Sequence, residues 1–140
     1  MRRVANPRAT DTWIYGEQMK PEIKAIYSLD VEDLETYKPP DASSFAFHLR
    51  VIAGPQSERG EESFDLRVCT PNWLLENYAK EEVIIGRHLL IVMEYGYQRI
   101  LKRITEFANT CTGDTWTEVA EKLSRLGYWE FEDYTENPTA

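Results

Sequence analysis

A chain of 140 residues suits one domain, and 42% hydrophobic residues supply enough side chains for a core. The formal net charge of -8 argues against binding to nucleic acid, which requires Lys and Arg to neutralise phosphates. No apolar run approaches the ~18 residues that cross a bilayer, and no segment has the pattern of a signal peptide. We therefore expect a cytoplasmic protein that does not bind membranes.

The N-terminal residues differ from the rest of the chain. Residues 1–18 hold three arginines and show no hydrophobic period, so we expect them to form a poorly ordered extension. We place a single domain at residues 19–136 and a short tail at 137–140. The main fold is therefore expected to begin near the second methionine, Met19.

Three strands are predicted in the first half of the domain. Alternating side chains indicate the first over 22–28, and a Pro-containing, acidic loop follows over 29–44. Stronger alternation predicts strands over 45–53 and 63–70, separated by a polar loop. We expect these two strands to pair antiparallel.

A short helix and a fourth strand are predicted next. Thr70 is a suitable N-cap and Pro71 a suitable first helical residue, and Trp73 is expected to anchor this helix on the core. The continuous apolar run at 89–93 is typical of a central strand that is covered on both faces.

Two longer helices close the domain. Apolar residues recur at helical spacing over 97–109. Thr115 and Glu118 form a capping-box pattern at the start of the second helix, and Gly127 is expected to end it. A final strand over 129–134 could join a sheet edge. The order predicts an α+β fold: an antiparallel sheet of about four to five strands with two main helices and one short helix packed on it.

The C-terminal segment is both acidic and aromatic. Residues 128–136 hold four acids and no base, together with Tyr, Trp and Phe. Segments that serve only solubility are poor in aromatic residues, so this composition favours a binding surface for a basic partner. A second acidic pair lies at Glu61 and Glu62. The candidate binding residues are Tyr128, Glu130, Glu132, Asp133 and Tyr134, with Glu61 and Glu62 as a secondary patch.

Catalytic and metal-binding motifs are absent from the sequence. Neither the histidines nor Cys69 and Cys111 have the spacing of a zinc site or a disulfide framework, so we predict no cofactor and no metal. An enzyme would have to assemble its site from distant residues. The side chains available for it are His48, His88, Glu94 and Cys69.

Several segments together resemble the Immunity protein 8 family of bacterial polymorphic toxin systems. They span nearly all of residues 19–134 and leave out the N-terminal extension. They are D-L-E-T-Y at 33–37, G-E-E-S-F-D at 60–65, C-T-P-N-W-L at 69–74, G-R-H-L-L-I-V at 86–92, Y-Q-R-I-L at 97–101, and the run from Gly113 to Tyr134.

The resemblance implies a non-enzymatic antidote that binds a cognate toxin domain. Many toxins that cut nucleic acids have basic substrate clefts, so the toxin could be a nuclease and the acidic surface could occlude such a cleft. We expect a monomer in the free state, although an exposed edge strand could also support a dimer. Two other functions stay open: an adaptor or subunit that binds a basic protein other than a toxin, and the enzyme described above.

Overall fold

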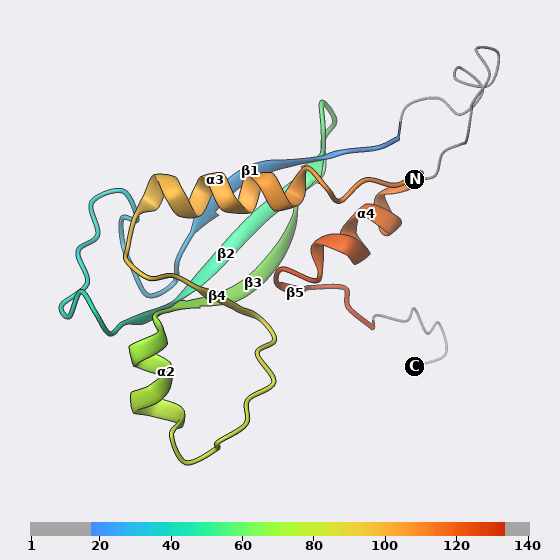
Figure 1. Cartoon of the computed structure of the whole chain (residues 1–140). Helices are drawn as coiled ribbons and strands as arrows, with labels where there is room; N and C mark the ends of the chain where they lie inside the picture. The colour runs from blue at the N-terminus through green and yellow to red at the C-terminus, as the bar shows by residue number, and fades with distance from the viewer. Residues whose placement is uncertain (1–17, 134–140) are drawn as a thin grey trace, which may run out of the picture.

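The computed structural model describes residues 18–133, and Figure 1 shows a mostly antiparallel sheet with three helices in this part of the chain. The predicted extension up to residue 17, the tail at 137–140 and Tyr134 lie outside the described residues. The fold is α+β, as predicted. Its elements are β1 (Pro21–Tyr27), β2 (Ala46–Pro55), β3 (Glu62–Cys69), α2 (Pro71–Tyr78), β4 (Leu89–Ile91), α3 (Tyr97–Ala108), α4 (Trp116–Leu123) and β5 (Tyr128–Trp129).

The sheet has the order β1-β2-β3-β4, and β5 also pairs with β3. Antiparallel pairing joins β1 to β2, β2 to β3, and β3 to β5, and the predicted pairing of β2 with β3 is confirmed. The pair β3–β4 is parallel, with Arg67 opposite Leu89 and Cys69 opposite Ile91. The expectation of an antiparallel sheet throughout is therefore wrong at this pair. The long connection through α2 gives the chain enough length to return in the same direction.

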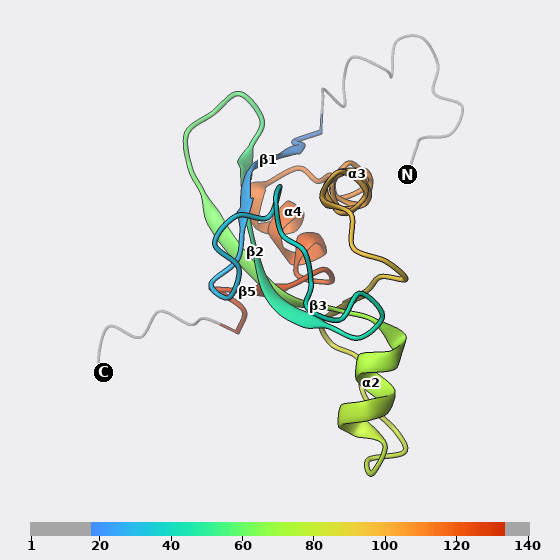
Figure 2. The same cartoon turned by 90° about the vertical axis from the view of Figure 1, so that its left-hand side faces the viewer.

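The core lies on one face of this sheet. Alternate residues of β2 and β3, such as Leu49, Val51 and Phe64, are almost completely buried there. Figure 2 shows α3 and α4 on that same side of the strands. Ile104 of α3 and Val119 of α4 are also buried in the cluster. The opposite face of β2 and β3 carries polar side chains such as His48, Arg50 and Asp65, and no helix within residues 18–133 packs across it.

The predicted caps position the helices. The Thr70 hydroxyl accepts from the Trp73 amide at 3.3 Å, and Pro71 is the first residue of α2. The Thr115 hydroxyl accepts from the Glu118 amide at 3.2 Å. In return, the Glu118 carboxylate accepts from the amide of Asp114, and not from that of Thr115. Helix α4 ends at Leu123, before the predicted end at Gly127.

Strand β4 differs from the prediction of a central strand. It has only three residues and lies at the edge of the sheet, where Ile91 is 47% exposed. Strand β5 occupies the neighbouring part of the same β3 edge, at Phe64 and Asp65, so β4 has only a short segment left to pair with. β5 is itself shorter than predicted, with two residues.

Helix α2 projects away from the sheet and does not pack on it (Figures 1 and 2). None of its residues is buried, because the helix starts beyond the end of β3. Trp73 is therefore not a core anchor as expected: its ring contacts the guanidinium of Arg67 and the ring of Tyr78. We call residues 71–86, which contain α2 and the segment after it, the arm.

Candidate interaction site

The fold brings the two acidic segments of the sequence together. The Ser63 amide donates to the Glu130 carboxylate at 2.8 Å, and the Glu130 amide donates to the Ser63 carbonyl at 3.3 Å. Glu61 and Glu62 therefore lie beside the segment that follows β5, although they are far from it in the sequence. We call Glu61, Glu62, Glu130, Glu132 and Asp133 the acidic edge.

Glu62 has an internal structural role within the acidic edge. One oxygen, Oε1, accepts from the indole of Trp116 at 2.9 Å and from that of Trp129 at 2.8 Å. This carboxylate therefore links α4 to β5. The Trp129 ring also stacks on Phe64, with ring centroids 6.5 Å apart, so it packs against the core.

The remaining acids differ in their exposure. Glu61, Glu130 and Asp133 are exposed. Glu132 is paired with Arg87, whose Nη2 lies 2.6 Å from its Oε1. The acidic edge therefore holds five carboxylates, of which this ion pair partly offsets one.

Tyr128 borders the acidic edge and faces the polar side of the sheet. It is 52% exposed. Its ring lies 4.3 Å from that of His88, centroid to centroid, and the Arg87 guanidinium lies 5.7 Å from its ring centroid. Tyr128 thus presents an apolar ring beside charged groups, as an amphipathic anchor would. Phe131, three residues after Tyr128, is 38% exposed, and its ring contacts that of Trp129 edge-on.

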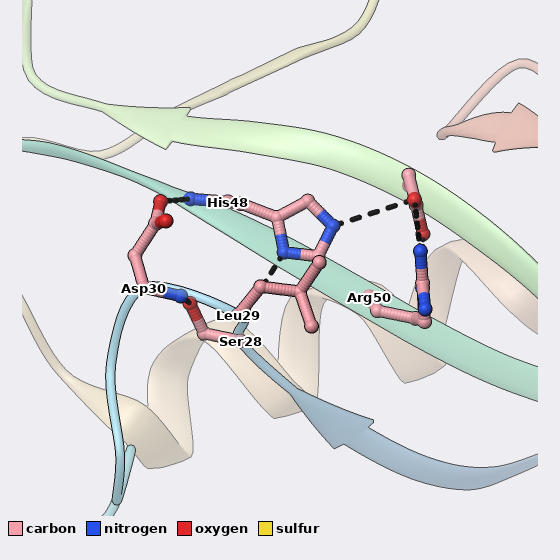
Figure 3. A network of polar contacts seen from close by, with 6 residues as sticks. Ser28, Leu29, Asp30, His48 and Arg50 are labelled. Atoms are coloured by element: carbon pink, nitrogen blue, oxygen red, sulfur yellow. Dashed lines mark hydrogen bonds and ion pairs between the residues drawn. The ribbon is translucent and has the colours of Figure 1, made fainter.

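A polar network crosses the open face of the sheet (Figure 3). Arg50 donates from Nε and Nη2 to the two carboxylate oxygens of Asp65, at 2.7 and 2.8 Å. This bidentate bond holds the pKa of Asp65 below its usual value, and the approach of His48 Nε2 to 3.4 Å acts in the same direction. Asp65 is therefore ionised at neutral pH, and both of its carboxylate oxygens accept hydrogen bonds from Arg50.

His48 connects this network to the loop after β1 (Figure 3). Its Nδ1 accepts from the Leu29 amide at 3.2 Å, and its own amide donates to Asp30 at 2.7 Å. Since Nδ1 accepts a hydrogen bond, the ring proton of the neutral form resides on Nε2, which lies 3.4 Å from Asp65. His48 therefore positions the loop against β2.

A groove of about 340 Å³ lies between this polar face and the arm. Its polar side includes His48, Asp65 and Arg67, and its apolar wall is contributed by the arm. Arg87, His88 and Tyr128 also line it, so the groove adjoins the acidic edge. The apolar side chains of the arm that line it are Leu74, Tyr78, Ile84 and Ile85.

His88 is buried where the groove meets α4. It is 5% exposed, and its Nε2 donates to the Ser124 carbonyl at 2.7 Å. Burial lowers the pKa of His88, and the nearby Arg87 adds to this effect. Among the described residues, its Nδ1 has no hydrogen-bond partner. Burial therefore disfavours the charged form of this ring, although the bond to Ser124 acts in the opposite direction.

Comparison with protein families shows to which family this chain belongs. The family model described as Immunity protein 8 matches residues 21–134, which is most of the chain. The chain belongs to the Immunity protein 8 family. The resemblance seen in the sequence is therefore confirmed. Searches of curated proteins and of solved structures gave no match. Membership of this family implies that the protein neutralises a cognate toxin.

Immunity proteins are generally inhibitors without catalytic activity, and the four residues considered for an enzyme are not gathered in one site here. His48 and His88 line the groove, but Glu94 lines a different pocket, beside β4. Cys69 is buried, and burial raises the pKa of its thiol, which disfavours the reactive thiolate.

Residues 18–133 of this immunity protein contain no cluster of three or more His, Cys, Asp or Glu side chains that could hold a metal ion. None of the helices in that range has the length and hydrophobicity to span a membrane. The acidic edge and the groove next to it are two neighbouring surface features of this part of the chain.

Proposed function

We propose that this immunity protein neutralises its toxin by placing the acidic edge, Tyr128 and Tyr134 over a basic site of the toxin. The observation that carries the proposal is the convergence of Glu61 and Glu62 with Glu130 and its neighbours on one side of the protein, where Glu61, Glu130 and Asp133 are exposed. The partner is a toxin domain with a basic substrate cleft, as in a nuclease.

Charge and aromatic side chains have separate roles in this mechanism. Complementary charge accelerates encounter and selects the orientation of the partner, but exposed ion pairs add only about 0.2–1 kcal/mol each. Aromatic side chains that become buried supply a larger share of the affinity. Tyr128, which is half exposed beside the carboxylates, is suited to that second role.

We further propose that the domain at residues 19–136 acts in the cytoplasm as a monomer and without catalysis. Inhibition by occlusion needs a surface and no reacting groups. The exposed carboxylates of the acidic edge favour separation of identical copies, because like charges would meet in a dimer formed through it.

The proposal is tested by co-expressing this chain with the toxin domain encoded beside its gene. We expect the cells to survive. We also expect a complex that co-purifies at low salt and weakens at high salt. A companion experiment replaces Tyr128 by Ala, which removes the anchor and leaves the carboxylates in place. Cell death with no complex would refute the pairing, and a gene neighbourhood without a toxin would favour an adaptor for another basic protein.

A further inference from the structure

The groove between the arm and the open face of the sheet differs in charge from the acidic edge. Asp65 lines the groove and is paired with Arg50. Glu132 lies next to the groove and is paired with Arg87, which lines it. Arg67 also lines the groove. Within residues 18–133, no carboxylate oxygen lies within ion-pair distance of Arg67. The groove therefore offers a cationic group in a protein whose net charge is -8.

Arg67 is held in position although it is exposed. Its guanidinium lies 5.3 Å from the ring centroid of Trp73, the first aromatic residue of α2. Stacking on an aromatic ring leaves the N–H groups at the guanidinium edge available, and these match the two oxygens of a carboxylate. The position of α2 thus orients Arg67 beside the groove.

The wall opposite is apolar and open to a partner. Ile85 is 89% exposed and Ile84 is 41% exposed, and both line the groove. Two adjacent isoleucines at this exposure leave a large apolar area in water, which a binding partner would cover with a favourable free energy. A hydrophobic wall beside a stacked arginine favours a ligand that has both an apolar and an anionic part.

We propose that the groove receives a segment of the toxin in which an apolar side chain lies next to an Asp or Glu. The apolar side chain packs on Ile84 and Ile85, and the carboxylate binds Arg67. This inference rests on the proposed function and adds a second contact of opposite charge beside the acidic edge. Two adjacent patches of opposite sign favour the orientation in which both meet a complementary group of the toxin.

The test compares pairs of variants in complexes with the toxin domain encoded beside the gene. Ile85→Ser removes part of the groove wall, and Val83→Ser is its control, because Val83 is 83% exposed and does not line the groove. Arg67→Gln removes the cation, and Arg103→Gln removes an exposed arginine of α3. Dissociation rates are measured by surface plasmon resonance, and the free proteins are examined by analytical ultracentrifugation.

We expect Ile85→Ser and Arg67→Gln each to raise the dissociation rate roughly tenfold, while the controls stay within about twofold. Toxin binding by the Ile85→Ser variant should depend on salt as strongly as binding by the unmodified protein, because this substitution changes no charge. Equal effects of Ile85→Ser and Val83→Ser would overturn the inference. So would a groove variant that changes self-association of the free protein and not toxin binding.

The two proposals fail in different ways. If the unmodified protein forms no complex and does not protect cells, the proposed function fails and the groove inference fails with it. If it protects cells, loses affinity when the acidic edge is neutralised, and keeps its affinity in the groove variants, only the groove inference is overturned.

Discussion

Glu62 combines two roles that substitution can separate. Its Oε1 accepts from both Trp116 and Trp129, so it stabilises the packing of α4 and β5 as well as adding charge to the acidic edge. An amide oxygen in the same place accepts the same bonds but has no charge. The charge and the hydrogen bonds of this residue can therefore be tested separately.

We predict that Glu62→Ala lowers the free energy of unfolding by about 1–3 kcal/mol, because two partly buried indole N–H groups lose their acceptor. Glu62→Gln should stay close to the unmodified protein in stability while binding the toxin more weakly. Glu61→Ala, at an exposed neighbour, serves as the control. Urea denaturation followed by Trp fluorescence measures these differences, and an equally stable Glu62→Ala protein would disprove the structural role.

His88 makes stability depend on pH, since its folded-state pKa is lowered below the ordinary value of about 6.5. The unfolded chain then binds a proton more readily than the folded protein. The stability associated with the neutral ring is fully present above that value and is lost as the pH falls through the window below it. Arg87, Glu132 and Tyr128 surround the ring and set this environment.

We predict that the free energy of unfolding decreases as the pH falls from 7 toward 5.5, with a slope from this residue of at most about 1.4 kcal/mol per pH unit. His88→Gln can still donate to the Ser124 carbonyl but does not titrate, so its profile should be flatter. Denaturation at a series of pH values measures both proteins. If the stability of both proteins changed with pH in the same way, His88 would not be the source of the pH dependence.

At the level of elements, close contact between the chain after α4 and β3 positions β5. Gly127 is buried, and a Cβ atom there would lie 3.0 Å from the Asp65 carbonyl oxygen and 3.0 Å from the Phe64 carbonyl carbon. These are backbone atoms of a paired strand and cannot move aside easily. Glycine thus allows Tyr128 and Glu130 to lie against β3.

We predict that Gly127→Ala destabilises the protein by about 1–3 kcal/mol through overpacking and also weakens toxin binding, because β5 is displaced. Gly86→Ala is the matched control: its Cβ would meet only the Leu89 side chain at the ordinary distance of 3.5 Å. Thermal denaturation of both variants tests the difference. Similar melting temperatures for the two variants would contradict this account of β5.

Local patterns in the sequence were sufficient for the elements whose residues interact with near neighbours. Alternation found β2 and β3, and helical periodicity with Thr115 found α3 and α4. The apolar run at 89–93 was misleading, because period and hydrophobicity do not distinguish a buried strand from an edge strand that leaves Ile91 exposed. The sequence likewise contains no signal that α2 starts beyond the sheet.

The candidate site could be predicted only in part for a related reason. The acidic composition around Glu130 was visible, but its contact with Ser63 depends on how β5 pairs with β3. The indole bonds of Glu62 and the groove join elements that are distant in the chain. No spacing rule predicts such contacts, since they follow from the assembled sheet.

At the scale of the whole molecule, charge is unevenly distributed and this distribution predicts how the protein meets its partner. The net charge is -8, and the acidic edge gathers carboxylates from two distant segments. A surface of this kind attracts a basic partner over about a Debye length, ~8 Å at physiological salt. Binding is therefore expected to weaken as salt increases, and the location of the charges should matter more than their number.

The most direct test measures toxin affinity at low and high salt for a variant that combines Glu130→Gln, Glu132→Gln and Asp133→Asn. These amides keep the hydrogen-bond acceptors of the acidic edge. The control combines Glu32→Gln, Glu35→Gln and Glu106→Gln, three exposed acids elsewhere, with the same change in net charge. We predict roughly tenfold weaker binding at low salt and a shallower salt dependence for the first variant only. Unchanged affinity and salt dependence in that variant would contradict binding through the acidic edge.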